Sequence, residues 1–139
     1  MAATIHVDIV SAEGQLFAGE ASMVFAPASQ GEIGIAPRHA PLLTTLKAGE
    51  VRVQIDGQDE QSFYVSGGAL EIQPRMVSIL ADSAVRAHDL DESAALQAKQ
   101  RAEVAMRGHV DKLEVAEATA ELARAMAQLQ AIERLRKKR

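Results

Sequence analysis

The chain has 139 residues, of which 47% are hydrophobic, so it can form one ordinary domain or one small domain with an appendage. Its aromatic content of 3% without Trp argues against base stacking and nucleic-acid binding, and the absence of Cys excludes disulfides, thiolate metal sites and a cysteine nucleophile. The formal net charge of −4 is uneven, because acidic residues dominate up to residue 88 and basic residues slightly outnumber them beyond it.

Residues 1–87 have the pattern of short β-strands separated by turns. Ile5, Val7 and Ile9 alternate with polar residues, which predicts a half-buried strand, and the segment Val51–Ile55 alternates in the same way. The other predicted strands are Met23–Ala26, Glu32–Ile35, Leu42–Leu46, Phe63–Val65, Ala69–Ile72, Met76–Ala81 and Ala84–Arg86. Pro and Gly residues between these segments predict turns, and many short strands at this spacing predict an antiparallel β-sandwich.

Residues 88–139 have helical composition, with no Pro, one Gly and frequent Ala. Asp89 or Asp91 can cap a first helix, and Gly108 is placed to end it. Asp111 with Glu114 three residues later predicts the start of a second helix. The link is so short that the two helices should form an antiparallel hairpin. The predicted fold class is therefore α+β, with a β-sandwich domain at 1–87 and a helical hairpin domain at 88–139.

The second predicted helix has a heptad pattern that should pack against the first. Its seam residues are Val115, Leu122 and Leu129 in one position and Ala118, Ala125 and Ile132 in the complementary one. Because many seam positions are Ala, the helices can approach closely but bury little apolar area, so we expect weak packing. A weakly packed hairpin can have more than one resting place.

Residues with catalytic or metal-binding chemistry are not grouped in any known motif. The four histidines have no partner at metal-ligand spacing and are His6, His39, His88 and His109. The segment Ser66–Gly68 lacks the G-x-S-x-G pattern and is better interpreted as a hairpin turn. There is also no phosphate-binding glycine loop. The sequence therefore predicts a protein that is not itself an enzyme and that holds no metal.

The most unusual segment of the first domain is residues 31–43, GEIGIAPRHAPLL. Its two Pro and two Gly residues should fix a loop, and it presents Glu32, Arg38 and His39 beside apolar residues. This mixture suits docking onto a partly polar surface. A strand and turn with incidental charges is an equally valid interpretation of the residues alone.

At this segment the chain resembles the epsilon subunit of the bacterial F-type ATP synthase, a family with the pattern G-E-[IL]-G-I-x-P-x-H-A-P-L-L. Further matching segments, in the same order as in the family, are Asp8–Glu13, Val65–Gly68, Leu80–Asp82, Asp89–Glu92 and Ala120–Ala123. The resemblance thus covers nearly the whole chain and implies the same architecture of β-sandwich and helical hairpin.

The resemblance also implies partners and roles. It implies a non-catalytic rotor subunit of the central stalk that couples proton flow through the ring of c subunits to ATP synthesis via the gamma subunit. By position, Glu32, Arg38 and His39 would contact the c ring, and Ser11 and Leu43 would lie near gamma. The hairpin would regulate the complex, permitting rotation when folded and inhibiting ATP hydrolysis when extended toward the alpha and beta subunits.

Some members of the family bind ATP through an [IL]-D-x-x-R-A motif at the start of the first helix. Here Asp91 is present, but Ala94 occupies the position of the motif Arg. Arg124 is retained in the second helix, whereas Gln128 replaces another Arg of ATP-binding members. Because phosphate-pairing cations are missing, we expect weak or absent ATP binding and no cofactor.

Localisation follows from the same comparison. The N-terminus lacks a signal peptide and no segment is apolar enough to span a bilayer, so the expected place is the cytoplasmic face of the bacterial inner membrane, reached only through the complex. The basic tail Arg134–Arg139 either binds an anionic surface or is a solvated helix end. From the residues alone, the alternative function is a β-sandwich binding module with a helical oligomerisation arm, whereas the resemblance implies a monomer when isolated.

Overall fold

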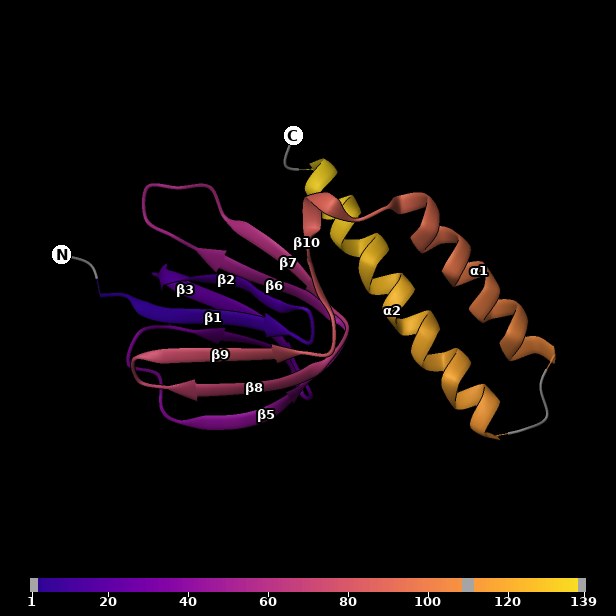
Figure 1. The fold of residues 1–139 in the computed structure, drawn as a ribbon, viewed down its shortest axis with the longest axis horizontal. Helices are drawn as coiled ribbons and strands as arrows, with labels where there is room; N and C mark the ends of the chain where they lie inside the picture. The colour runs from indigo at the N-terminus through magenta and orange to yellow at the C-terminus, as the bar shows by residue number, and fades with distance from the viewer. Residues whose placement is uncertain (1–2, 109–111, 138–139) are drawn as a thin grey trace. The chain divides into compact units, whose positions relative to one another are not determined.

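The structure is a computed structural model that describes residues 3–108 and 112–137. The chain divides into two compact units, Met1–Arg86 and Ala87–Arg139 (Figure 1). The first unit consists of strands and the second of helices, as the sequence predicts.

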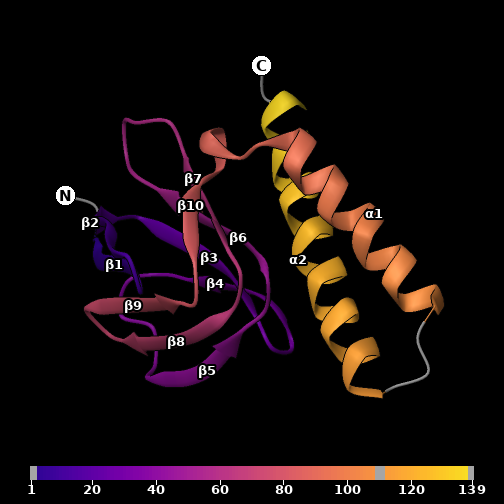
Figure 2. The same ribbon diagram turned by 45° about the vertical axis from the view of Figure 1, so that its right-hand side comes forward.

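Ten strands are found among the described residues of the first unit. They are β1 (Ile5–Ser11), β2 (Gly14–Ala21), β3 (Met23–Ala28), β4 (Gly31–Ile35), β5 (Leu42–Leu46), β6 (Gly49–Gln54), β7 (Gln61–Val65), β8 (Gly68–Gln73), β9 (Met76–Ala81) and β10 (Ala84–Arg86). They are joined in the order β10-β7-β6-β3-β5-β8-β9-β1-β2, and β4 pairs with β3. Figure 2 shows this sheet folded over, with β5, β8 and β9 in one layer and β3, β6 and β7 in the other.

The strand pairing is mixed rather than wholly antiparallel. The pair β1–β9 is parallel, with Val7 opposite Val77, and the other pairs are antiparallel. A parallel pair needs a long crossover connection, which here is the whole run of strands from β2 to β8. The α+β class with a sandwich and a hairpin is confirmed, and the prediction of uniformly antiparallel pairing is corrected at this one pair.

The core of the first unit follows the predicted alternation. Ile5, Val7 and Ile9 are fully buried, while the residues between them are partly exposed. Val51 and Val53 are buried in the same way. Ile55 lies beyond the end of β6 and is only packed against the edge of the core. The core is built from aliphatic side chains with Phe63 as its largest member, in keeping with the low aromatic content.

Strand β2 was missing from the predicted elements. Its exposure pattern has no regular alternation, because the register against β1 shifts between Ile9 and Val10. Such an irregularity interrupts the period of two on which strand prediction rests. The strand begins at Gly14, whose φ of 128° suits a residue without a side chain.

The side chain of Arg86 in β10 contacts β2, so it connects the two terminal strands of the strand order. Its Nη2 atom donates a hydrogen bond of 3.0 Å to the backbone oxygen of Leu16 in β2. Its guanidinium lies 5.3 Å from the ring centroid of Phe63, which in turn packs 5.5 Å from the ring of Phe17 in β2. Side-chain contacts, rather than strand pairing, thus bring the two terminal strands of the order together.

The second unit contains a short 3₁₀ turn, η1 (Ala87–Asp89), and two helices, α1 (Glu92–Gly108) and α2 (Lys112–Lys137). Asp91 caps α1, since its Oδ1 atom accepts a 3.2 Å hydrogen bond from the backbone nitrogen of Ala94. An ion pair joins Arg136 near the end of α2 to Glu92 at the start of α1, so the helices are antiparallel as predicted. Asp111, predicted to begin the second helix, lies outside the described residues, as does the end of the basic tail.

Alanine fills the interior of the helical unit. Every fully buried residue in its described part is Ala, namely Ala87, Ala95, Ala102, Ala118, Ala125 and Ala131. The larger residues of the predicted seam are only half-buried and are Val115, Leu122, Leu129 and Ile132. Small buried side chains allow close approach of the helices but remove little apolar surface from water.

Candidate functional site

The segment 31–43 forms strand β4, a connection at 36–41 and the start of β5. Arg38 in the connection has a φ of 66°, the left-handed conformation that side chains rarely adopt. Its backbone nitrogen donates a 2.9 Å hydrogen bond to the oxygen of Pro74 in the turn between β8 and β9. His39 folds back on the same connection, with its Nδ1 atom 2.7 Å from the oxygen of Ala40. The connection is therefore anchored, and it leaves the Arg38 side chain exposed.

Glu32 lies in strand β4, apart from the connection that contains Arg38 and His39. Its Oε1 atom lies 2.6 Å from Nη2 of Arg52 in β6, on the far side of strand β3. Strand β4 runs on to Ile35, about 10 Å further along at 3.3 Å per residue, before the connection with Arg38 and His39 begins. The three residues predicted to act together thus belong to two places, an anchored cationic connection and a carboxylate paired with Arg52.

Leu43 lies on the outward face of the layer that includes β5, β8, β9 and β1. The register places Leu43 beside Glu71, Ser78 and Asp8, one residue on each strand. Leu43 is 73% exposed and Leu80 on the same face is 51% exposed. Both are unusually open for large apolar residues, which marks this face as a candidate docking surface.

Ser11 and Leu43 are not brought together. Ser11 is the last residue of β1, three positions beyond Asp8, and its hydroxyl accepts a 3.2 Å hydrogen bond from the nitrogen of Glu13. Leu43 instead lines a shallow pocket of about 340 Å³ with Pro41, Leu42, Glu71 and Gln73. The two residues predicted to face gamma would have to contact different parts of a partner.

Polar groups border the same face near the start of β1. His6 lies between two carboxylates, with Nδ1 2.9 Å from Oε2 of Glu20 and Nε2 3.1 Å from Oδ1 of Asp8. The hydrogen bond with Glu20 raises the pKa of His6 above its ordinary value of 6.5, and Asp8 acts in the same direction against the opposing effect of desolvation. Sequence reasoning did not single out this triad, because Glu20 belongs to the unpredicted strand β2.

The residues expected to form a weak ATP site lie far apart along the hairpin. Asp91 is occupied as the cap of α1, beside Glu92 and its partner Arg136. Arg124 lies twelve residues before Arg136 on the same helix, a distance of about 18 Å at 1.5 Å per residue. The folded hairpin therefore does not bring Asp91 and Arg124 to one site.

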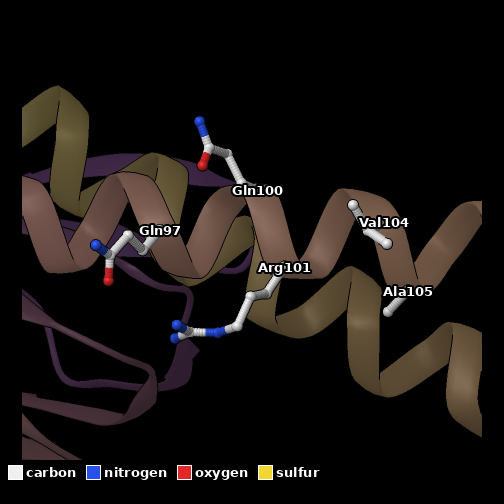
Figure 3. Close-up of a pocket in the computed structure, with 5 residues that line it drawn as sticks. All are labelled: Gln97, Gln100, Arg101, Val104 and Ala105. Atoms are coloured by element: carbon white, nitrogen blue, oxygen red, sulfur yellow. The ribbon is translucent and has the colours of Figure 1, made fainter.

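Helix α1 carries a pocket that sequence reasoning did not find. It has a volume of about 470 Å³ and is lined by Gln97, Gln100, Arg101, Val104 and Ala105 (Figure 3). These residues recur at helical spacing on one face, and Figure 3 shows Gln97 and Arg101 extending to the same side of the helix. The lining offers amide and guanidinium donors but no nucleophile or general base.

Neither a metal centre nor a membrane-spanning helix is found in residues 3–108 and 112–137. These residues contain no cluster of three or more side chains able to hold a metal ion. None of the helices formed by them is long and apolar enough to cross a membrane.

Similarity to known proteins extends over both units. Residues 4–87 match the family model described as the beta-sandwich domain of the ATP synthase delta/epsilon chain, and residues 88–133 match its long alpha-helix domain. A protein of Nitrosococcus oceani named ATP synthase epsilon chain is 61% identical over 138 residues, which is 99% of each chain. A protein of the same name from Halorhodospira halophila is 59% identical, covering 97% of this chain and 96% of the relative.

The fold is also found in solved structures. A chain in the mitochondrial ATP synthase of Euglena gracilis aligns with a TM-score of 0.84 at 18% identity, covering 94% of this chain and 82% of that chain. A chain in the Tetrahymena thermophila enzyme aligns with a TM-score of 0.65 at 12% identity. At these identities the structural likeness shows the fold, whereas the two family models and the relatives near 60% identity show the descent. The resemblance noted from the sequence is confirmed, and the chain belongs to the ATP synthase delta/epsilon chain family.

Proposed function

We propose that this chain is a non-catalytic central-stalk subunit of a rotary ATP synthase that couples proton flow through the c ring to ATP synthesis via gamma. The observation that carries the proposal is the match of both units to relatives named ATP synthase epsilon chain. The stalk role suits a closed β-sandwich with an aliphatic core, because close packing transmits strain with little deformation. The subunit would be peripheral at the cytoplasmic face of the bacterial inner membrane, held there by the complex.

The c-ring contact would involve both parts of the segment 31–43. Arg38 presents a cation from a connection that is fixed by its hydrogen bond to Pro74, and His39 stiffens the same connection. Glu32 presents a carboxylate that is 53% exposed. A fixed surface of mixed charge is suited to polar loops of a partner.

The gamma contact would use the outward face that includes Leu43 and Leu80. Exposed apolar residues flanked by carboxylates of Glu71 and Asp8 resemble the centre and rim of a protein interface. Ser11 would contribute at the far end of β1.

The hairpin would regulate hydrolysis by moving between a folded and an extended position, the latter in contact with the alpha and beta subunits. Two observations support this role. The buried residues in its described part are all Ala. The start of α1 and the end of α2 are joined by an ion pair of Glu92 and Arg136, whose side chains are 44% and 64% exposed. Exposed ion pairs add little stability, so the folded position can be left at low cost.

The solution behaviour of the isolated chain tests the stalk role against the alternative of a binding module with an oligomerisation arm. We expect a monomer by light scattering that forms a one-to-one complex with gamma. Leu43→Asp should weaken gamma binding about tenfold or more, because it places a charge in the apolar centre of the outward face. A stable dimer that does not bind gamma would support the alternative.

Nucleotide binding by the isolated chain should be weak or absent. Ala94 and Gln128 supply no phosphate-pairing cation. Arg124 also lies about 18 Å along α2 from Arg136, whose partner Glu92 is next to Asp91. Calorimetric titration with ATP should give no saturable heat at micromolar concentrations, whereas micromolar affinity would contradict the expectation.

A further inference from the structure

We propose that Arg52 is a positioning residue that holds the Glu32 carboxylate ready to accept a hydrogen bond from a guanidinium, ammonium or amide group on the partner of β4. The inference rests on the proposed contact of Glu32 with the c ring. It adds a residue outside segment 31–43 and specifies the chemistry of the group that Glu32 would meet.

The strand pairing places Arg52 within reach of Glu32. Strand β3 lies between β4 and β6, and Phe25 at its middle is opposite both Gly34 and Arg52. The Arg52 side chain extends along this row and donates from Nη2 to Oε1 of Glu32 at 2.6 Å. A short charge-assisted contact of this kind fixes the direction of the carboxylate as well as its charge.

Arg52 itself is firmly held. Its guanidinium lies over the Phe25 ring, 4.3 Å from the ring centroid, which is a cation–π contact. Its side chain is only 15% exposed. Gly34 leaves the room for this arrangement, because a Cβ there would lie 3.0 Å from Met23 Cε and 3.3 Å from Phe25 Cε1. The half-exposed carboxylate of Glu32 is thus paired with a guanidinium that is nearly buried and lies over the Phe25 ring.

The charges of the cluster indicate the partner's chemistry. A second carboxylate, Glu60, has its Oε2 atom 3.9 Å from Nη1 of Arg52, so two anions surround one cation. Glu60 is 18% exposed, whereas Glu32 is 53% exposed and faces solvent. An ionised carboxylate can only accept hydrogen bonds and has lone pairs beyond the one that Arg52 occupies. The complementary group is therefore a donor, with a cation preferred.

The test uses the purified ATP synthase in proteoliposomes, with proton pumping measured per ATP hydrolysed. The variants are Glu32→Gln, Arg52→Met, Arg52→Lys and the double variant Glu32→Gln/Arg52→Met, with Asp56→Asn as a control for loss of an exposed carboxylate. Glu32→Gln is preferable to charge reversal, since a Lys at 32 would repel Arg52 and disturb the fold. Thermal unfolding of each isolated variant reports on stability.

We expect Glu32→Gln and Arg52→Met each to lower the coupling ratio several-fold and the double variant to be no worse than either single variant, because both remove the same interaction. Arg52→Lys should restore part of the coupling, and Asp56→Asn should leave it unchanged.

Three results would overturn the inference in distinguishable ways. If Glu32→Gln lowers coupling and Arg52→Met does not, the ring contact stands and positioning by Arg52 is wrong. If the two effects add and Arg52→Met also lowers the unfolding temperature, Arg52 acts only through the fold. If Glu32→Gln leaves coupling unchanged, the proposed ring contact at Glu32 is itself wrong.

Discussion

Gly68→Ala should prevent stable folding of the β-sandwich. Gly68 has a φ of 140°, and a Cβ added there would lie 2.0 Å from the backbone oxygen of Leu80 and 3.0 Å from Cα of Ala81. The clash is with the backbone of the neighbouring strand β9, so no side chain can turn aside to relieve it. We expect a loss above about 4 kcal/mol, a large part of the total stability of a small domain. Circular dichroism during thermal unfolding would measure it.

Gly57→Ala is the matched control. Gly57 also has a positive φ, 76°, but a Cβ there would meet nothing within 4 Å. Its replacement should cost only the left-handed strain of about 1 kcal/mol. If the two variants unfolded at similar temperatures, the close approach of β8 and β9 at Gly68 would not limit stability.

Deletion of residues from Asp89 onward should raise ATP hydrolysis by the purified complex while leaving assembly intact. The strands and their core belong wholly to the unit that ends at Arg86, so the deletion removes no core residue of the sandwich. If the hairpin inhibits by occupying an extended position, its loss should raise the hydrolysis rate about fivefold or more, the range of a typical regulatory coupling energy.

The content of gamma and of the truncated chain in the complex is the control for this experiment. Unchanged hydrolysis in a fully assembled complex would show that the hairpin does not inhibit. Loss of the truncated chain from the complex would instead show that the hairpin is needed for attachment, which also contradicts the expected separation of roles between the units.

Most of the fold could be predicted because the informative patterns are local. Ile5, Val7 and Ile9 identify a strand within five residues, and the pair Asp89 and Asp91 indicates a helix start, of which the structure selects Asp91 as the cap. Strand β2 escaped prediction because its register shift removes the alternation. The parallel pairing of β1 with β9 could not be predicted either, since the paired residues are some 70 positions apart and no local sequence pattern indicates which distant strand is the partner.

The candidate site was less predictable for the same physical reason. Segment 31–43 is conspicuous because rigid and charged residues are adjacent in it, but Arg52 lies 20 residues from Glu32 and its neighbours give no hint of the pairing. Likewise, the heptad pattern identified Ala118 and Ala125 on α2, whereas the burial of Ala95 and Ala102 on α1 was not predicted from the sequence. Whether the named residues contact gamma and the c ring stays a prediction.

The all-alanine interior of the hairpin has a consequence for how its position would respond to temperature. The heat-capacity change of an opening reaction scales with the apolar surface that becomes hydrated. Separation of α1 from α2 would expose the buried Ala methyl groups and the covered part of half-buried seam residues such as Leu122 and Leu129. The opening free energy should therefore curve less with temperature than that of a core of fully buried large aliphatic side chains. Ionic strength, which screens the exposed pair of Glu92 and Arg136, should shift the equilibrium only slightly, because an exposed ion pair adds little stability.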